Sequence, residues 1–227
     1  MRVAVVTFPG SNCDDDCAHA FGAVLPHTVL RVWHKEQSLP ERTDLVVLPG
    51  GFSYGDYLRT GAMARLSPIM TAVAAHARRG GLVLGICNGF QILCEAGLLP
   101  GALLRNNGLS FVCQPVPLRV ETDQSPLTRH ATPGEVLTLP IAHGEGNYYI
   151  DDEGLRRLES EDLVLLRYTN PRGEVTAASN PNGSRAAIAG IQSPSRRVMG
   201  LMPHPERAAE SAIGNTEGLV LLEGLCA

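Results

Sequence analysis

Cys87 is the residue of this sequence best suited to act as a nucleophile. It lies in residues 85–89, Gly-Ile-Cys-Asn-Gly, directly after the wholly apolar stretch 82–86. Small residues on both sides allow the sharp strand-to-helix turn called a nucleophile elbow. A helix predicted over 89–96 would place Cys87 at its amino end, where the helix dipole favours a thiolate. We therefore interpret Cys87 as a nucleophile and not as a buried structural thiol, which is the usual role of a free cysteine.

A thiol nucleophile needs a general base, and residues 202–206, Met-Pro-His-Pro-Glu, offer one. His204 precedes a proline, which favours an extended backbone. Positions i and i+2 of an extended segment face the same way, so Glu206 can reach and orient the imidazole. Alone, such a segment is more often a surface turn. Beside a cysteine elbow it predicts a Cys87–His204–Glu206 triad, which is defined by roles and not by chain order.

A glycine-rich loop, residues 49–56, follows the apolar stretch 45–48 and reads Pro-Gly-Gly-Phe-Ser-Tyr-Gly-Asp. Hydrolases with a nucleophile elbow take one oxyanion donor from the residue after the nucleophile, here Asn88, and a second from a neighbouring strand-end loop. Gly51 suits the second role, because glycine allows the backbone to turn its N–H toward a substrate. A tight turn without function is an equally good interpretation of the loop.

Two other glycine-containing loops give weaker signals. Residues 9–12 could bind an anion at a helix start, but they lack both the G-x-G-x-x-G pattern and a Walker lysine, so no cofactor is expected in this chain. Residues 142–149 contain a histidine that is more often structural, the alternative being a binding or docking loop. Cys13, Cys17 and His19 lack a full zinc ligand set, so no metal is expected.

Apolar stretches alternate with helical patterns in the first half of the chain. This alternation is typical of a parallel sheet covered on both faces, with the carboxyl ends of its strands along one ligand-binding edge. Strands are expected over 2–8, 29–33, 45–48 and 82–86, and helices over 13–25, 62–79 and 89–96.

Shorter strands with turn-rich connections are expected after residue 113, together with a closing helix. The strands are predicted over 116–121, 136–141, 163–168, 175–178, 186–192 and 197–201, and the helix over 216–225. The sequence shows no linker or repeat, so residues 1–227 are expected to form one domain. The predicted fold class is α/β, with a mostly parallel central sheet flanked by helices and a smaller antiparallel β region.

Composition narrows the environment and the partners. Of 227 residues, 44% are hydrophobic and 19% charged, which is typical of a soluble globular protein. The net charge of −4 argues against nucleic acid or an anionic membrane as the main partner. No stretch approaches the roughly 18 apolar residues that cross a bilayer. The six cysteines therefore indicate free thiols in a cytoplasmic protein.

The motifs resemble those of class I (triad) glutamine amidotransferases. That class is indicated by residues 85–91 and 203–206. Longer segments narrow the resemblance to the glutaminase subunits of phosphoribosylformylglycinamidine synthases, enzymes of purine biosynthesis; they are residues 8–14, 49–59, 142–146 and 202–207. The resemblance runs nearly from end to end and implies a flavodoxin-like fold.

The resemblance also implies a mechanism. Cys87 would attack the side-chain amide of L-glutamine, form a γ-glutamyl thioester and release ammonia. His204 would transfer the proton, and Glu206 would orient His204. The ammonia would pass to a separate synthetase subunit that binds ATP, Mg²⁺ and formylglycinamide ribonucleotide, with a small third subunit bridging the two.

Five further residues gain roles from the resemblance. Gly51 and Asn88 would supply the oxyanion N–H groups. Gln91, Asn106 and Phe111 would contribute to the glutamine pocket.

Two alternative functions stay open from the sequence. A cysteine hydrolase or peptidase on a related α/β scaffold would cleave peptides without any synthetase. A non-catalytic docking subunit would use the elbow only as architecture, but it would need none of Cys87, His204 and Glu206.

Overall fold

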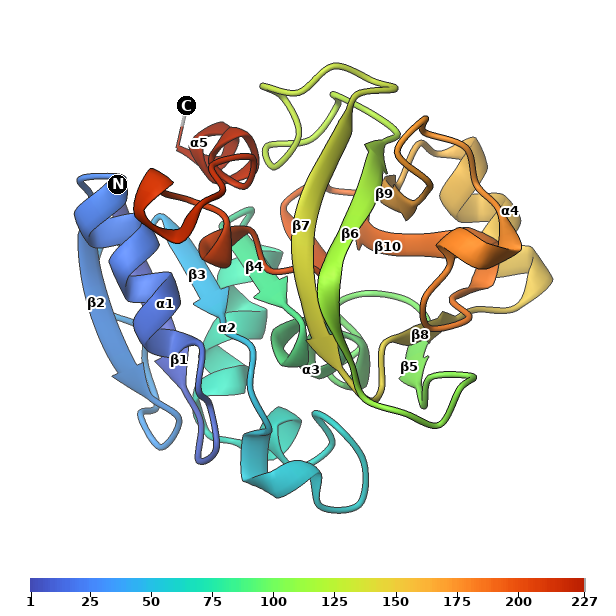
Figure 1. The fold of residues 1–227 in the computed structure, drawn as a ribbon. Helices are drawn as coiled ribbons and strands as arrows, with labels where there is room; N and C mark the ends of the chain where they lie inside the picture. The colour runs from blue at the N-terminus through green and yellow to red at the C-terminus, as the bar shows by residue number, and fades with distance from the viewer. Residues whose placement is uncertain (227) are drawn as a thin grey trace.

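A nine-stranded sheet forms the centre of the molecule in this computed structural model, which describes residues 1–226 (Figure 1). The strands are β1 (Arg2–Thr7), β2 (Thr28–Trp33), β3 (Leu45–Leu48), β4 (Leu82–Ile86), β5 (Ala102–Leu104), β6 (Val112–Val120), β7 (Val136–His143), β8 (Asn147–Tyr149), β9 (Val164–Tyr168), β10 (Ile188–Gln192) and β11 (Val198–Leu201). The order in the large sheet is β2-β1-β3-β4-β11-β10-β9-β6-β7, while β5 pairs with β8 in a separate two-stranded sheet.

Half of the large sheet is parallel and half antiparallel. Strands β2, β1, β3, β4 and β11 pair in parallel. Strands β10, β9, β6 and β7 continue the same sheet through antiparallel pairs. The predicted α/β class is therefore confirmed, and the antiparallel region extends the central sheet instead of standing apart from it.

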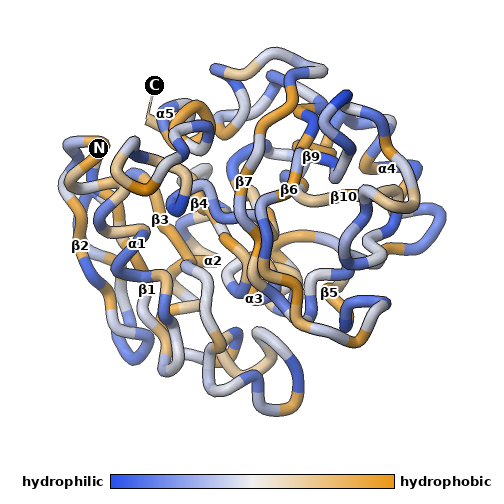
Figure 2. Tube along the Cα trace, in the orientation of Figure 1, coloured by the Kyte–Doolittle hydropathy of each residue, from blue (hydrophilic) through white to orange (hydrophobic). Residues whose placement is uncertain are grey.

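Helices cover both faces of the parallel half. They are α1 (Asp14–His19), α2 (Ile69–Arg78), α3 (Asn88–Glu95) and α5 (Leu219–Leu225), whereas α4 (Asp152–Ser160) lies on the side of the antiparallel strands (Figure 1). In Figure 1, α1 lies in front of the sheet and α2 behind it. Such coverage explains why every residue of β3, β4 and β11 is buried. In Figure 2, hydrophobic residues are concentrated along strands of this half such as β3, and many of the surrounding loops are hydrophilic.

Some predicted elements differ from the observed ones. The strand predicted over 175–178 is wrong: this segment ends in a short 3-10 turn, Ala177–Ser179, whose amino end is capped by Thr176. The helix predicted over 62–79 is divided at Pro68 into a 3-10 turn, Ala64–Leu66, and α2. Proline fixes its backbone and cannot donate a hydrogen bond, so it starts α2 and cannot continue an earlier helix.

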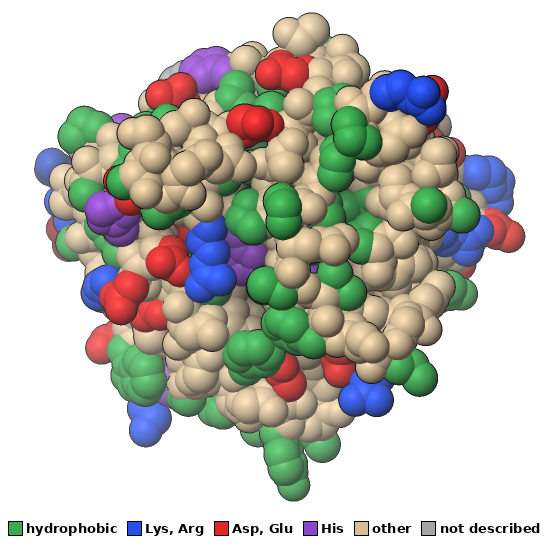
Figure 3. All heavy atoms as spheres, in the orientation of Figure 1, with side chains coloured by type: hydrophobic (Ala, Val, Ile, Leu, Met, Phe, Trp, Pro, Cys, Tyr) green, Lys and Arg blue, Asp and Glu red, His purple; other side chains and the backbone are tan. Residues whose placement is uncertain are grey.

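Two features of the structure concern binding to nucleic acid and to membranes: the charge of the surface and the length of the helices. The visible face in Figure 3 mixes acidic and basic side chains, without a broad patch of one sign. None of the helices within residues 1–226 is long and apolar enough to cross a membrane.

Candidate active site

Cys87 occupies a strained turn between β4 and α3. Its backbone angles, φ 51° and ψ −105°, are rare for a residue with a side chain. Hydrogen bonds hold the turn: the Cys87 N–H donates to the Leu201 carbonyl (2.8 Å), and the Phe90 N–H donates to the Cys87 carbonyl (3.0 Å). The Cys87 thiol faces the Ala142 carbonyl, 3.7 Å from Sγ. The surrounding structure thus imposes the conformation of a nucleophile elbow.

Both glycines of the elbow are required by close packing. A Cβ atom on Gly89 would lie 1.9 Å from the Leu48 carbonyl oxygen. A Cβ atom on Gly85 would lie 2.6 Å from the backbone of Gly89. The helix after the nucleophile can approach β3 and β4 this closely only because these positions lack side chains, which is the physical basis of the Gly-x-Cys-x-Gly pattern.

His204 and Glu206 form a buried pair beside the elbow. The His204 Nδ1 atom lies 2.6 Å from Glu206 Oε1, and both side chains are almost fully inaccessible to solvent. The His204 N–H donates to the Pro140 carbonyl (2.9 Å), which fixes the segment after β11 against β7. A Cβ atom on Gly50 would lie 2.7 Å from Cε1 of the imidazole, so the ring is held on that side too.

The charges around His204 favour its protonated form. Burial lowers the pKa of His204, but the Glu206 carboxylate, the Cys87 sulfur and side-chain interactions with Cys13 and Cys87 outweigh burial. The net result is a pKa well above the ordinary value of 6.5. An imidazole in these surroundings can take a proton from Cys87 and hold it as an imidazolium.

Gly51, the predicted second oxyanion donor, has a backbone conformation that favours glycine. Its φ is +139°, and a Cβ atom would lie 2.7 Å from the Asn12 nitrogen. The neighbouring bonds join Phe52 N–H to the Gly10 carbonyl (2.9 Å) and Asn12 N–H to the Gly50 carbonyl (3.4 Å). These two bonds join the loop 49–56 to residues 9–12. They use the N–H groups of Phe52 and Asn12, so the Gly51 N–H is left for another acceptor.

Asn88 contributes a second backbone donor next to the nucleophile. It is the first residue of α3, and N–H groups in a first helical turn have no acceptor within the helix. Its side chain is fully engaged, accepting from the Ser53 N–H (3.2 Å) and donating to Gln91 Oε1 (2.9 Å). This side chain ties the glycine loop to α3 and fixes the relative positions of the two candidate oxyanion donors.

Two small cavities meet at Cys87. They share one wall, formed by Gly51, Phe52, Cys87, Phe111 and Ala142. One, of about 110 Å³, continues to Asp56, Thr60, Gln91, His143, Gly144 and Glu145. The other, of about 170 Å³, continues to Asn12, Cys13, His204 and Arg207.

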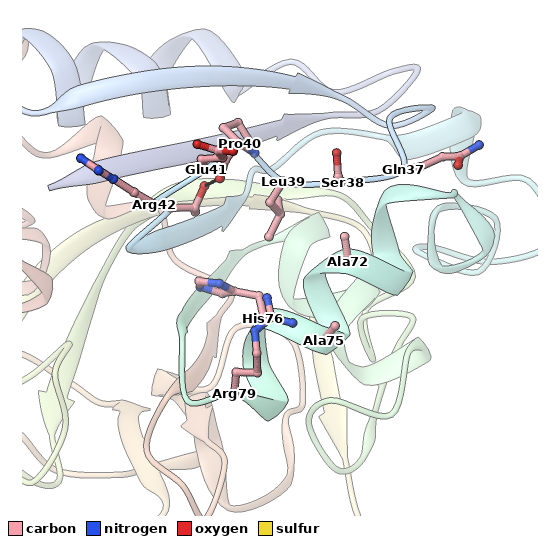
Figure 4. Close-up of a pocket in the computed structure, with 11 residues that line it drawn as sticks. Gln37, Ser38, Leu39, Pro40, Glu41, Arg42, Ala72, Ala75, His76 and Arg79 are labelled. Atoms are coloured by element: carbon pink, nitrogen blue, oxygen red, sulfur yellow. Dashed lines mark hydrogen bonds between the residues drawn. The ribbon is translucent and has the colours of Figure 1, made fainter.

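A larger cavity lies elsewhere, and its lining includes no cysteine. Its volume is about 510 Å³, and it lies between the loop 37–43 and α2 (Figure 4). His76 is its only histidine, and a Cβ atom on Gly81 would lie 2.2 Å from the imidazole, so the ring packs against the backbone there. The arrangement that can perform chemistry is therefore the one around Cys87.

The three residues expected in the glutamine pocket occupy different positions. Gln91 lines the smaller cavity, where its Nε2 atom donates to the Glu145 carbonyl (2.6 Å). Phe111 lines both cavities, and its ring centroid lies 6.3 Å from that of Phe52. Asn106 is buried among backbone groups and is absent from both walls.

All polar atoms of the Asn106 side chain are used within the protein. Nδ2 donates to the carbonyls of Ser110 and His143, each at 2.9 Å, and Oδ1 accepts from the Gly146 N–H (3.0 Å). The bonds to His143 and Gly146 hold residues 143–146 in the wall of the smaller cavity. We infer that Asn106 positions this wall and does not contact the substrate.

The sequence did not identify two acidic residues of the smaller cavity. Burial, followed by repulsion from Glu145, raises the pKa of Asp56 from 3.8 to about 6. The Thr60 hydroxyl donates to Glu145 Oε2 (3.0 Å). Asp56 lay within the predicted glycine loop and Glu145 within residues 142–149, but their proximity depends on the fold. Together they place negative charge in the cavity that Cys87 also lines.

His143 also lies in this wall, and its Nε2 atom is 3.5 Å from Asn182 Nδ2. Burial and the charge of His204 lower its pKa from 6.5 to about 4, so it is neutral at physiological pH. Asn182 Nδ2 donates to the Gly146 carbonyl (2.8 Å) and to the Tyr168 hydroxyl (3.2 Å). Residues 142–149, which the sequence favoured as a structural segment, therefore combine internal hydrogen bonding with a place at the cavity.

Sequence comparisons find close relatives along the whole chain. The family model of the CobB/CobQ-like glutamine amidotransferase domain matches residues 1–217. The phosphoribosylformylglycinamidine synthase subunit PurQ of Salinibacter ruber is 55% identical over 224 residues, which are 99% of this chain and 95% of the relative. The corresponding subunit of Moorella thermoacetica is 54% identical over 225 residues, with the same coverage.

Comparisons with solved structures also find relatives that match along nearly the whole chain. The structure of PurLQS from Thermotoga maritima is similar with a TM-score of 0.87 and 43% identity, covering 99% of this chain and 97% of that chain. The glutaminase domain of CTPS from Trypanosoma brucei with bound acivicin has a TM-score of 0.63 at 12% identity, covering 100% of this chain and 94% of that one. The second likeness concerns the fold alone.

Proposed function

The chain belongs to the CobB/CobQ-like glutamine amidotransferase family, and from this membership we propose that it is the glutaminase subunit of a phosphoribosylformylglycinamidine synthase. It hydrolyses L-glutamine and delivers ammonia for purine biosynthesis. One observation supports the chemistry most strongly: the strained Cys87 elbow faces the buried His204–Glu206 pair at one edge of the sheet. Identity over nearly the full chain favours this function over a peptidase or a non-catalytic subunit.

In the first half-reaction, Cys87 Sγ attacks the side-chain carbonyl carbon of glutamine. His204 takes the thiol proton, and its raised pKa stabilises the imidazolium that results. The N–H groups of Gly51 and Asn88 stabilise the oxyanion, each by about 3 kcal/mol in comparable sites. The imidazolium then protonates the leaving nitrogen, so ammonia departs and a γ-glutamyl thioester remains on Cys87.

In the second half-reaction, His204 removes a proton from water. The resulting hydroxide attacks the thioester, and the proton returns to the sulfur as glutamate leaves. Glu206 keeps the imidazole oriented through both steps by its 2.6 Å contact with Nδ1. The sum is glutamine plus water giving glutamate plus ammonia.

The smaller cavity gives the substrate its orientation. A glutamine whose amide carbon lies at Cys87 carries an α-ammonium group at its other end. Asp56 and Glu145 supply negative charge in the same cavity, and Gln91 lines its wall. We assign the α-ammonium to this acidic side, which favours free glutamine over an amide without a nearby positive charge.

Ammonia formed at Cys87 passes to a partner. We place ATP, Mg²⁺ and formylglycinamide ribonucleotide on a synthetase subunit, with a small subunit bridging the two proteins. Support comes from the similarity to PurLQS, which covers nearly the whole of both chains. We also propose a cytoplasmic location. We propose a single domain over residues 1–227, because the nine strands of the large sheet come from segments spread between Arg2 and Leu201; residue 227 lies outside the described residues.

The proposal is tested by replacing Cys87 in the reconstituted synthase. Cys87→Ala is expected to abolish glutamine-dependent synthesis and to leave ammonia-dependent synthesis intact. Cys113→Ala, which removes an exposed thiol, serves as the matched control with both activities. Loss of both activities in Cys87→Ala would assign the cysteine a structural role, and loss of neither would refute the nucleophile.

A further inference from the structure

Cys13 brings a second thiol to the catalytic imidazole. It lies just before α1, and its side chain is only 2% exposed. Cys13 Sγ, a ring nitrogen of His204 and a carboxylate oxygen of Glu206 all lie within 4.8 Å of one another. The glutaminase mechanism uses His204 and Glu206 but gives no task to Cys13.

Two buried atoms of this cluster are poorly satisfied. Within residues 1–226, Glu206 Oε2 has no hydrogen-bond partner, and His204 Nε2 has none except the weak interactions of the imidazole with the Cys13 and Cys87 thiols. The Cys13 thiol donates weakly to Asn12 Oδ1, at 3.2 Å. Buried polar atoms without partners are costly, so a ligand that satisfied them would bind favourably. The cavity of about 170 Å³ reaches both Cys13 and His204 and offers a route to them.

The donor set determines which ligand fits. One sulfur, one imidazole nitrogen and one carboxylate oxygen are ligands that Zn²⁺ accepts together, whereas Ca²⁺ and Mg²⁺ require oxygen. A Cys13 thiolate and the Glu206 carboxylate would balance the charge of a divalent cation. Arg207 also faces the cluster, but its guanidinium is bound to Asp16 (2.9 Å), which offsets its positive charge.

We propose that Cys13, His204 and Glu206 form a site for a thiophilic divalent cation such as Zn²⁺, and that an occupied site stops glutamine hydrolysis. The inhibitory effect rests on the proposed function, because a metal-bound imidazole cannot accept the proton of Cys87. Binding requires a neutral imidazole and a thiolate as ligands.

Binding is measured first, without reference to activity. Co²⁺ is titrated into the full chain, and sulfur-to-cobalt charge-transfer absorption reports thiolate ligation. Cys87→Ser is expected to keep this absorption, whereas Cys13→Ser should weaken cobalt binding by about 10- to 100-fold. Cys17→Ser, another buried cysteine, is the matched control and should bind as the parent does. Unchanged absorption and affinity in Cys13→Ser would overturn the proposed site. Thermal unfolding shows whether this variant is folded, and if it is not, Cys13→Ala is used in its place.

Inhibition is then measured in the synthase complex. Zn²⁺ should suppress glutamine-dependent synthesis reversibly, with recovery on adding a chelator, and spare ammonia-dependent synthesis. Relative to its own uninhibited rate, Cys13→Ser should require about tenfold more Zn²⁺. Equal sensitivity of Cys13→Ser and the parent would contradict the inhibitory site. A complex without any glutaminase activity would instead contradict the proposed function, while the cobalt titration would still decide whether the site exists.

Discussion

The two halves of the sheet contribute to the active site in different ways. The parallel half supplies Gly51, Cys87 and His204 from the loops after β3, β4 and β11. The antiparallel half supplies the Ala142 carbonyl and the wall formed by residues 143–146, next to β7. The first set can perform chemistry, and the second set shapes the space in which the substrate lies.

Different forces hold the two sets. At the parallel edge, backbone geometry dominates: Cys87 has a positive φ, and Gly89 touches the Leu48 carbonyl. Beside the antiparallel half, side-chain amides from distant segments, Asn106 and Asn182, bind the backbone of the wall. This difference predicts that substitutions can impair catalysis and substrate binding separately. Changes at the parallel edge should lower kcat, and changes around residues 143–146 should mainly raise KM.

The largest effect is expected from Glu206→Gln. The amide cannot support the imidazolium as the carboxylate does, and it favours the wrong tautomer of His204. We expect kcat for glutamine to fall by about 10³-fold or more, with little change in KM and none in ammonia-dependent synthesis. Steady-state kinetics of the complex measure this. A fall smaller than tenfold would show that Glu206 does not orient the base.

A smaller effect is expected from Gly51→Ala. Its Cβ atom would collide with the Asn12 nitrogen at 2.7 Å and displace the oxyanion donor. The expected loss is about 10²-fold in kcat, the typical effect of removing one such donor. Gly55→Ala is the matched control, because Gly55 also has a positive φ (+66°) but nothing within 4 Å of its Cβ position. Equal losses in both variants would indicate backbone strain in the loop as the cause.

Asn106→Ala tests the antiparallel side. It removes three hydrogen bonds, of which two hold residues 143–146 and one holds the Ser110 carbonyl. We expect KM for glutamine to rise about tenfold while kcat changes little, together with a loss of stability of about 1–3 kcal/mol. Kinetics and urea unfolding measure the two effects. Asn107→Ala, on the exposed neighbour, is the control; a loss of kcat without a change in KM would contradict the division between the two halves.

The smallest effect is expected for Asp56, and it is a change in KM for glutamine that depends on pH. The Asp56 pKa of about 6 means that the carboxylate is ionised above pH 6 and neutral below it. Only the ionised form attracts the α-ammonium of glutamine, so KM should rise several-fold as the pH falls from 7 to 5. In Asp56→Asn, KM should be raised at pH 7 and lose this dependence. An unchanged pH profile in the variant would exclude Asp56 from substrate binding.

The difference between the parallel and antiparallel halves also explains which parts of the site the sequence could predict. The elbow, the triad residues and Gly51 were identified because tight turns and prolines leave a local pattern, and the structure brings Cys87, His204 and Gly51 around common cavities. The repulsion between Asp56 and Glu145, and the hydrogen bonds of Asn106, depend on segments far apart in the chain. The strand predicted over 175–178 failed for a related reason, since its residues have no strand to pair with in the observed sheet.

Labelling by a glutamine-analogue electrophile tests the central claim most directly. Cys87 is only 5% exposed, whereas Cys113 is exposed, so simple accessibility would favour Cys113. The account predicts that peptide mass spectrometry finds the label on Cys87 first, that L-glutamine protects this position, and that His204→Asn slows the labelling strongly. Labelling of Cys113 before Cys87, unaffected by glutamine, would contradict the assignment of Cys87 as the nucleophile.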